Sequence, residues 1–94
     1  MEKMRIQALL VEDNPADVLF LREALGQDAL ATFELATAES LAEALECLAE
    51  QEFAAILLDL GLPDSQGLPT FQKLHQAAPE LPVVVLSALD DEEV

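Results

Sequence analysis

The sequence has few basic residues, since four lysines and arginines stand against nineteen acids and give a net charge of −15. A chain with this charge repels nucleic acid and anionic membranes, so we expect neither as a direct partner. No apolar run approaches the roughly 18 residues that would span a bilayer. The apolar stretch near the N-terminus stops at Glu12-Asp13, too soon for a signal peptide. The single cysteine, Cys47, cannot form an internal disulfide, which fits a reducing cytoplasm.

The most informative stretch of the chain is residues 53–67, where six apolar residues lead directly into Asp59. Turn-forming residues, among them Gly61 and Pro63, follow at once. A short unbroken apolar run bounded by such residues is typical of a strand buried on both faces of a parallel sheet. Open α/β sheets bind ligands at the carboxyl ends of their strands. Asp59 is therefore the strongest candidate for a functional residue.

Strand and helix patterns alternate along the 94 residues, which we expect to form one small domain. Asn14-Pro15 is a typical helix start, and Ser40 with Glu43 forms a capping box. The patterns predict strands at 6–11, 32–36, 53–58 and 82–86, helices at 15–25, 41–50 and 69–78, and the start of another helix at 90–93. This alternation predicts an α/β fold in which a doubly wound parallel sheet lies between two layers of helices.

Polar residues follow three of the predicted strands: Glu12 and Asp13 follow the first, Asp59 the third and Ser87 the fourth. Parallel strands place all of them at one rim of the sheet, where the carboxylates repel one another. A hard cation such as Mg²⁺ relieves this repulsion, and the carbonyl of Gly61 could join as a ligand. An aspartate beside Mg²⁺ can attack phosphorus and form an aspartyl phosphate. Ser87 could then donate a hydrogen bond to the phosphoryl group.

These motifs, taken in register, resemble the receiver domain of bacterial two-component response regulators. The resemblance covers the whole chain and rests on Glu12-Asp13-Asn14, Asp59, Pro63, Gly67 and Ser87-Ala88. It implies a flavodoxin-like sheet of strand order 2-1-3-4-5. It also implies a signalling phosphoacceptor rather than an enzyme, although receivers assist their own phosphoryl transfer and dephosphorylation.

The resemblance assigns a role to each residue at the rim. Asp59 would take a phosphoryl group from a sensor histidine kinase or a phosphotransfer protein. Asp13, Asp59 and the Gly61 carbonyl would bind Mg²⁺, or Mn²⁺, directly, and Glu12 would act through a water molecule. Ser87 would be the switch hydroxyl that moves toward the phosphoryl group. An output domain, fused or separate, would respond to the change.

The family's fifth strand, its fifth helix and most of its fourth helix have no counterpart in residues 1–94. We therefore expect a receiver domain that is incomplete at its C-terminus and belongs to a longer protein. The family's phosphate-pairing lysine and its aromatic switch residue lie in the missing part. No basic residue of this chain is placed to replace that lysine; the four are Lys3, Arg5, Arg22 and Lys73. We also expect strand 83–86 to form an open apolar edge through which the chain could pair as a homodimer.

Two other functions remain open at this point. A degenerate receiver-like domain would use the same fold only for protein assembly. A flavodoxin-like cofactor binder would share the sheet topology, but Glu12-Asp13-Asn14 offers acids where a phosphate-binding loop would want Gly, Ser and Thr. His75 and Cys47 have no ligand partners in the sequence, so we expect a solvated helix residue and a small apolar residue at the core boundary.

Overall fold

The computed structural model describes residues 4–27 and 31–86. The expected switch hydroxyl Ser87 and the expected helix start at 90–93 lie outside the described residues. The elements, in chain order, are β1 Met4–Val11, α1 Pro15–Gly26, β2 Ala31–Ala38, α2 Leu41–Glu50, β3 Ala55–Leu58, β4 Gly61–Leu62, β5 Ser65–Gln66, α3 Leu68–Ala77 and β6 Val83–Val85.

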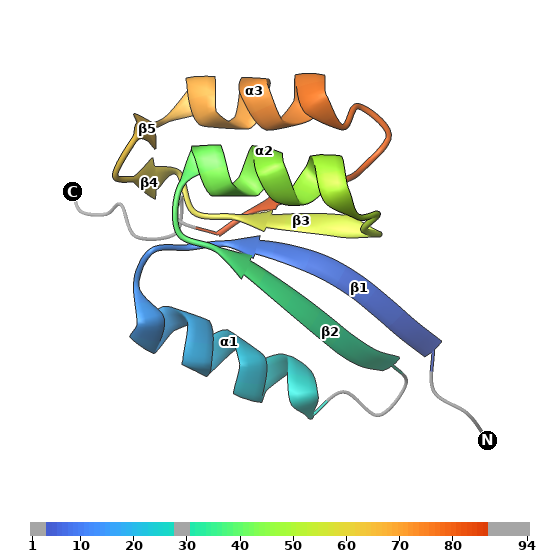
Figure 1. The fold of residues 1–94 in the computed structure, drawn as a ribbon. Coiled ribbons are helices and arrows are strands. Elements are labelled where there is room, and N and C mark those ends of the chain that lie inside the picture. Colours follow the sequence, from blue (N-terminus) through green and yellow to red (C-terminus); the bar gives the residue numbers. More distant parts are fainter. Residues whose placement is uncertain (1–3, 28–30, 87–94) are drawn as a thin grey trace.

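Four strands form one parallel sheet in the order β2-β1-β3-β6. This is the predicted order 2-1-3-4, because β6 is the fourth strand of the main sheet along the chain. Helix α1 covers one face of the sheet, and α2 and α3 lie side by side on the other (Figure 1). The α/β fold with three layers is therefore confirmed.

The centre of the sheet is buried on both faces. Four consecutive residues of β1, at positions 8–11, are at most 2% exposed, as expected for a central strand. Alternate strand residues such as Leu9 and Ile56 pack in the same core cluster as Leu41 of α2 and Leu74 of α3. The α1 side is less well covered, because α1 contributes no fully buried side chain and Phe20 is 70% exposed.

The helix starts follow the capping signals of the sequence. Asn14 Oδ1 accepts a hydrogen bond from the Ala16 N–H at 2.9 Å, and Ser40 Oγ accepts one from the Glu43 N–H at 3.1 Å. In a standard capping box the Glu43 carboxylate would accept a hydrogen bond from the N–H of the N-cap, Ser40. Here it accepts one from the N–H of Glu39, the residue before the N-cap. The predicted box therefore forms with a shifted return bond.

The segment after β3 contains a small antiparallel hairpin, β4–β5, that the sequence analysis did not predict. Leu62 of this hairpin is 1% exposed and belongs to the main core cluster. Ser65 and the fully buried Thr70 are joined by a hydroxyl–hydroxyl hydrogen bond of 2.6 Å, which ties the hairpin to α3. Gly67 precedes α3 with a φ of 74°, a conformation that favours glycine.

Asp64, in the turn of this hairpin, caps α2 from a distance of more than twenty residues in sequence. Its two carboxylate oxygens accept hydrogen bonds from the N–H groups of Leu41 at 2.8 Å and Ala42 at 3.1 Å. These bonds favour the charged form and hold the pKa of Asp64 below its usual range. The exposed carboxylate therefore fixes the hairpin to the N-terminus of α2.

We predict that Asp64→Ala lowers the melting temperature at pH 7, because two N–H groups of α2 lose their acceptor. Since the folded-state pKa is depressed, this contribution is fully present above the ordinary aspartate pKa of about 4 and is lost as the pH falls through the lower folded-state value. Thermal melts from pH 2 to pH 7 measure the difference. Glu80→Ala, at another exposed loop acid, is the control and should change little. A constant difference at every pH would show that the Asp64 charge is not involved.

Candidate metal centre

Three carboxylates meet where β1 and β3 end. Glu12 and Asp13 follow β1 directly, and Asp59 follows β3, its parallel neighbour. Backbone hydrogen bonds continue past the strand ends: the Asp59 N–H donates to the Val11 carbonyl at 3.0 Å, and the Glu12 N–H donates to the Ala38 carbonyl at 2.9 Å. The sheet therefore fixes the backbone beneath two of the three acids.

One oxygen from each of Glu12, Asp13 and Asp59 lies within 4.8 Å of the other two. Glu12 is buried at 5% exposure, Asp59 is half-buried and Asp13 is exposed. Oxygen ligands of this kind suit a hard divalent cation, and the exposed side leaves room for water or phosphate oxygens. The arrangement can therefore hold a metal ion.

The protonation of Glu12 bears on whether a cation fits between the three carboxyl groups. Burial, a side-chain hydrogen bond with Asp59 and the negative charge of Asp59 together raise the pKa of Glu12 to about 7. The Asn14 N–H donates to Glu12 Oε2 at 3.2 Å and acts in the opposite direction. Without a cation, Glu12 therefore keeps its proton up to about neutral pH in its place beside Asp59. A bound cation would take over the role of that proton, so the donor set fits a metal.

Gly61 lies beside Asp59 but touches it through its N–H, which donates to Asp59 Oδ1 at 3.0 Å. A Cβ atom at Gly61 would lie 3.7 Å from the same oxygen, which is an ordinary contact distance. The hydrogen bond from the Gly61 N–H orients the Asp59 carboxylate. A larger residue than glycine would also fit at position 61 without a clash with that carboxylate. The Gly61 carbonyl as a metal ligand stays a prediction.

The site also includes residues that the sequence analysis did not single out. A hollow of 130 Å³ beside the acids is lined by Thr37 and Glu39 as well as by Glu12 and Asp13. Thr37 and Glu39 lie at the end of β2, at the same rim of the sheet. The sequence could have indicated these two residues, because they follow the second predicted strand just as the acids follow the first and third. Ser87 cannot be placed at this rim, since it lies outside the described residues.

Two further reactive side chains lie away from the acids. His75 is exposed on α3 and stacks on Phe71, with ring centroids 5.7 Å apart. Cys47 is half-buried on α2 against the core, and burial raises the pKa of its thiol. Their positions, one on an exposed helix face and one at the core boundary, are those predicted from the sequence.

None of the helices in the described part of the chain has the length and the apolar character needed to span a bilayer.

The chain is similar throughout to proteins of one family. The response regulator receiver domain family matches residues 8–94. The KDP operon transcriptional regulatory protein KdpE of Escherichia coli K12 is 43% identical over 84 residues, which are 89% of this chain and 36% of KdpE. The chain thus spans about a third of that relative's length.

Solved structures agree in fold. The non-phosphorylated HemR receiver domain from Leptospira biflexa has a TM-score of 0.73 at 29% identity, over 93% of this chain and 68% of that chain. The phosphorylated cyanobacterial phytochrome response regulator RcpA has a TM-score of 0.75 at 30% identity, over 86% of this chain and 64% of that chain.

We predict that Glu12 makes the metal-free protein less stable as the pH rises from about 4.5 to about 7. The folded state binds the Glu12 proton more tightly than the unfolded chain, so the free energy of unfolding falls over this interval. Glu12→Gln should remove roughly 1–3 kcal/mol of that decline. Urea denaturation in a chelating buffer at several pH values measures it. Parallel pH profiles for the two proteins would contradict the raised pKa.

Proposed function

Because the chain belongs to the response regulator receiver domain family, we propose that it is a phosphoacceptor of a two-component system. Asp59 is the residue that accepts the phosphoryl group. The observation that carries this proposal is the convergence of Glu12, Asp13 and Asp59 at one rim of the sheet. RcpA, which is 30% identical to this chain, is itself a phosphorylated response regulator.

Mg²⁺, or Mn²⁺ in its place, is the cation that we propose for the acid cluster. Asp13, Asp59 and the Gly61 carbonyl would hold it directly, and Glu12 would act through a water molecule. When bound, it would neutralise charge on the carboxylates and on an incoming phosphoryl group. The pKa of Glu12, raised to about 7, supports the proposal, because it shows how strongly this cluster disfavours a further unpaired negative charge.

The chain's own groups position Asp59 for attack. The Gly61 N–H holds one carboxylate oxygen, and the backbone bond to Val11 holds the residue at the end of β3. In the transfer, an Asp59 oxygen forms a bond to phosphorus while the phosphorus–nitrogen bond of a phosphohistidine breaks, and the electron pair of that bond stays on the imidazole nitrogen. The donor would be a sensor histidine kinase or a phosphotransfer protein.

The other expectations from the sequence also enter the proposal. Ser87 would be the hydroxyl that responds to the phosphoryl group, and residues 1–94 would be an incomplete receiver domain in the cytoplasm. KdpE is a transcriptional regulatory protein and is much longer than the matched segment. An output domain, fused or separate, would therefore read the state of Asp59 in this protein too.

A second candidate is a receiver-like domain that serves only in assembly. One observation favours it: among the described residues, no basic side chain lines the hollow beside the acid cluster. Arg5, one of the described basic residues, pairs with Glu34 at 3.5 Å instead. In an assembly-only domain phosphoryl transfer to Asp59 would be absent, because no nearby cation would stabilise the transferred charge.

We predict that Asp13→Ala weakens Mg²⁺ or Mn²⁺ binding by more than about tenfold, since it removes a direct ligand. Calorimetric titration or Mn²⁺ relaxation measures the affinity. Asp17→Ala is the matched control: it removes one negative charge from the first turn of α1, outside the cluster. Ser87→Ala should also bind nearly as well as wild type. If Asp13→Ala binds with unchanged affinity, the metal centre is wrongly assigned.

We predict that a small phosphodonor labels the chain slowly and only in the presence of Mg²⁺. The modification should be stable in acid and labile in base, as an acyl phosphate is, and it should disappear in Asp59→Asn. Intact-mass spectrometry with peptide mapping follows it. A label that persists in Asp59→Asn, or that maps to Ser87, contradicts the assignment. Absence of any label at saturating Mg²⁺ would favour the assembly-only function.

A further inference from the structure

A cleft opens at the end of the molecule opposite the acid cluster. It lies where α2 and α3 finish, beside Phe53, which precedes β3, and Leu81, which precedes β6. Asp59, by contrast, follows β3. The cleft has a volume of about 370 Å³, which falls within the range of roughly 300–1,000 Å³ that is usual for ligand sites.

The inner wall of the cleft is apolar and rigidly supported. Phe53 is 8% exposed and belongs to the main core cluster. Leu48 of α2 and Leu81 are half-buried and pack against the same cluster. Each of them therefore presents part of an apolar side chain to the cleft while the rest is held in the core.

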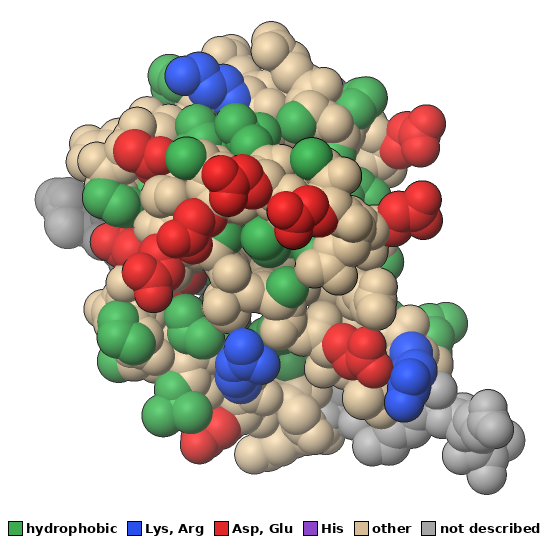
Figure 2. Space-filling view, viewed as in Figure 1, with side chains coloured by type: hydrophobic (Ala, Val, Ile, Leu, Met, Phe, Trp, Pro, Cys, Tyr) green, Lys and Arg blue, Asp and Glu red, His purple; other side chains and the backbone are tan. Residues whose placement is uncertain are grey.

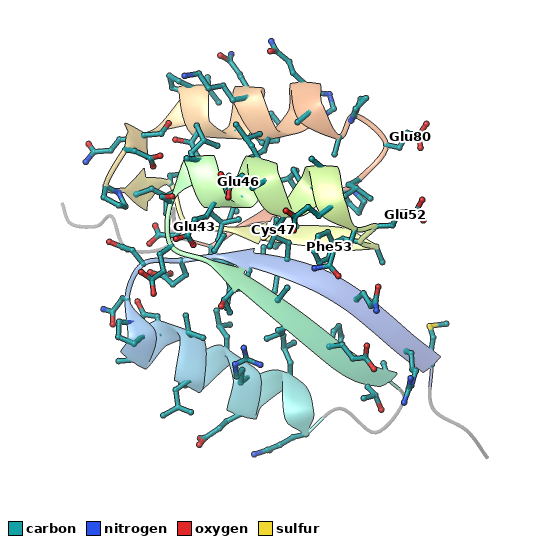
Figure 3. The ribbon with its side chains drawn as sticks, viewed as in Figure 1. Glu43, Glu46, Cys47, Glu52, Phe53 and Glu80 are labelled. Atoms are coloured by element: carbon teal, nitrogen blue, oxygen red, sulfur yellow. The ribbon has the colours of Figure 1, made fainter. Side chains whose placement is uncertain are left out.

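The rim of the cleft is negative. Glu52 and Glu80 both line it, both are exposed, and Figure 3 shows their side chains projecting on the same side of the molecule. Within residues 4–27 and 31–86, no basic side chain lines the cleft. Acidic side chains also gather over the neighbouring α2 (Figure 2).

The helix ends add to this charge. Gln51, directly after α2, and Ala78, directly after α3, both line the cleft, so two helix C-termini point at it. A helix C-terminus carries roughly half a negative charge. The last turn of α2 contains no basic side chain that would offset it, and that of α3 contains only His75. An apolar wall with a negative rim is complementary to a group that is both apolar and cationic.

We propose that this cleft binds a basic segment of a partner protein. An apolar side chain of that segment rests on Leu48, Phe53 and Leu81, and the cationic heads of neighbouring lysines or arginines meet Glu52 and Glu80. Lysine and arginine suit this setting, because their stems cover apolar surface while their charges stay at the rim. The net charge of −15 steers a basic partner toward the chain.

The surface around Phe53 favours a peptide over a small cation. Glu52 and Phe53 also line a second hollow of about 400 Å³, on the side of β1 and β2, together with Gln7 and with Arg5, which pairs with Glu34 at 3.5 Å. The two hollows meet at these shared residues. A ligand of several consecutive residues can therefore occupy both, whereas a small cation would fill only one.

The test uses capped tetrapeptides and the full chain labelled with ¹⁵N. A peptide of alternating leucine and arginine should shift the amide signals of residues 51–53 and of Ala78, Glu80 and Leu81 in a saturable way. A leucine–glutamate peptide should cause no shifts, and a glycine–arginine peptide should bind more weakly because it lacks the apolar contact. Shifts centred on Asp13 and Asp59 would place the peptide at the acid cluster and overturn the proposal. Equal affinity for the glycine–arginine peptide would do the same.

A pair of matched double variants separates the cleft from general charge attraction. Glu52→Gln with Glu80→Gln should weaken binding of the leucine–arginine peptide about tenfold, the loss expected for two exposed ion pairs. Glu23→Gln with Glu46→Gln removes the same charge from exposed positions on α1 and α2 that do not line the cleft. This control should change the affinity less than about twofold at physiological salt. Equal weakening in both pairs would show attraction to the acidic surface alone.

Discussion

The parallel pairing of β1 with β3 is the constraint on which the acid site depends. Their ladder ends with the Asp59 N–H bound to the Val11 carbonyl, so that Glu12 and Asp59 are held side by side despite their charge. The pKa of Glu12, about 7 in place of 4.5, corresponds to a cost of roughly 3 kcal/mol at neutral pH. Burying Leu9, Ile56 or Leu58 contributes about 1.5–3 kcal/mol each. A few core side chains of the two strands therefore offset the whole cost of the site.

The segment between Asp59 and α3 is held on several sides, which explains how a loop can carry a defined site. The Gly61 N–H is bound to Asp59, and Leu62 is buried in the core. Asp64 is bound to the first turn of α2, and Ser65 is bound to Thr70 of α3. The loop thus connects the carboxylate of Asp59 to both helices on that face. A change at Asp59 that moves Gly61 has to strain or break these contacts.

The sequence predicted the features that local pattern determines. Apolar runs and capping residues predicted the strands of the main sheet and the helices that cover it. Because the carboxyl ends of parallel strands lie at one rim, the sequence also predicted that Glu12, Asp13 and Asp59 lie close together. It did not predict the contacts that depend on tertiary structure. The bonds from Asp64 to Leu41 and Ala42 join residues far apart in sequence, and two-residue strands such as β4 and β5 have no periodicity to detect. The burial of a helix also depends on the elements packed around it, and α1 has no fully buried residue.

Negative charge has different physical effects at the two ends of the sheet, the acid cluster and the cleft. Glu12 is 5% exposed, so its interaction with Asp59 is poorly screened by salt and appears as a raised pKa. Glu52 and Glu80 are exposed, so a cation at the cleft gains little from either one alone, and that gain falls as the ionic strength rises. The binding proposed for the cleft would therefore draw most of its strength from the apolar wall of Leu48, Phe53 and Leu81. Charge at the cleft would select which partner approaches, whereas charge at the acid site would determine whether a cation can bind.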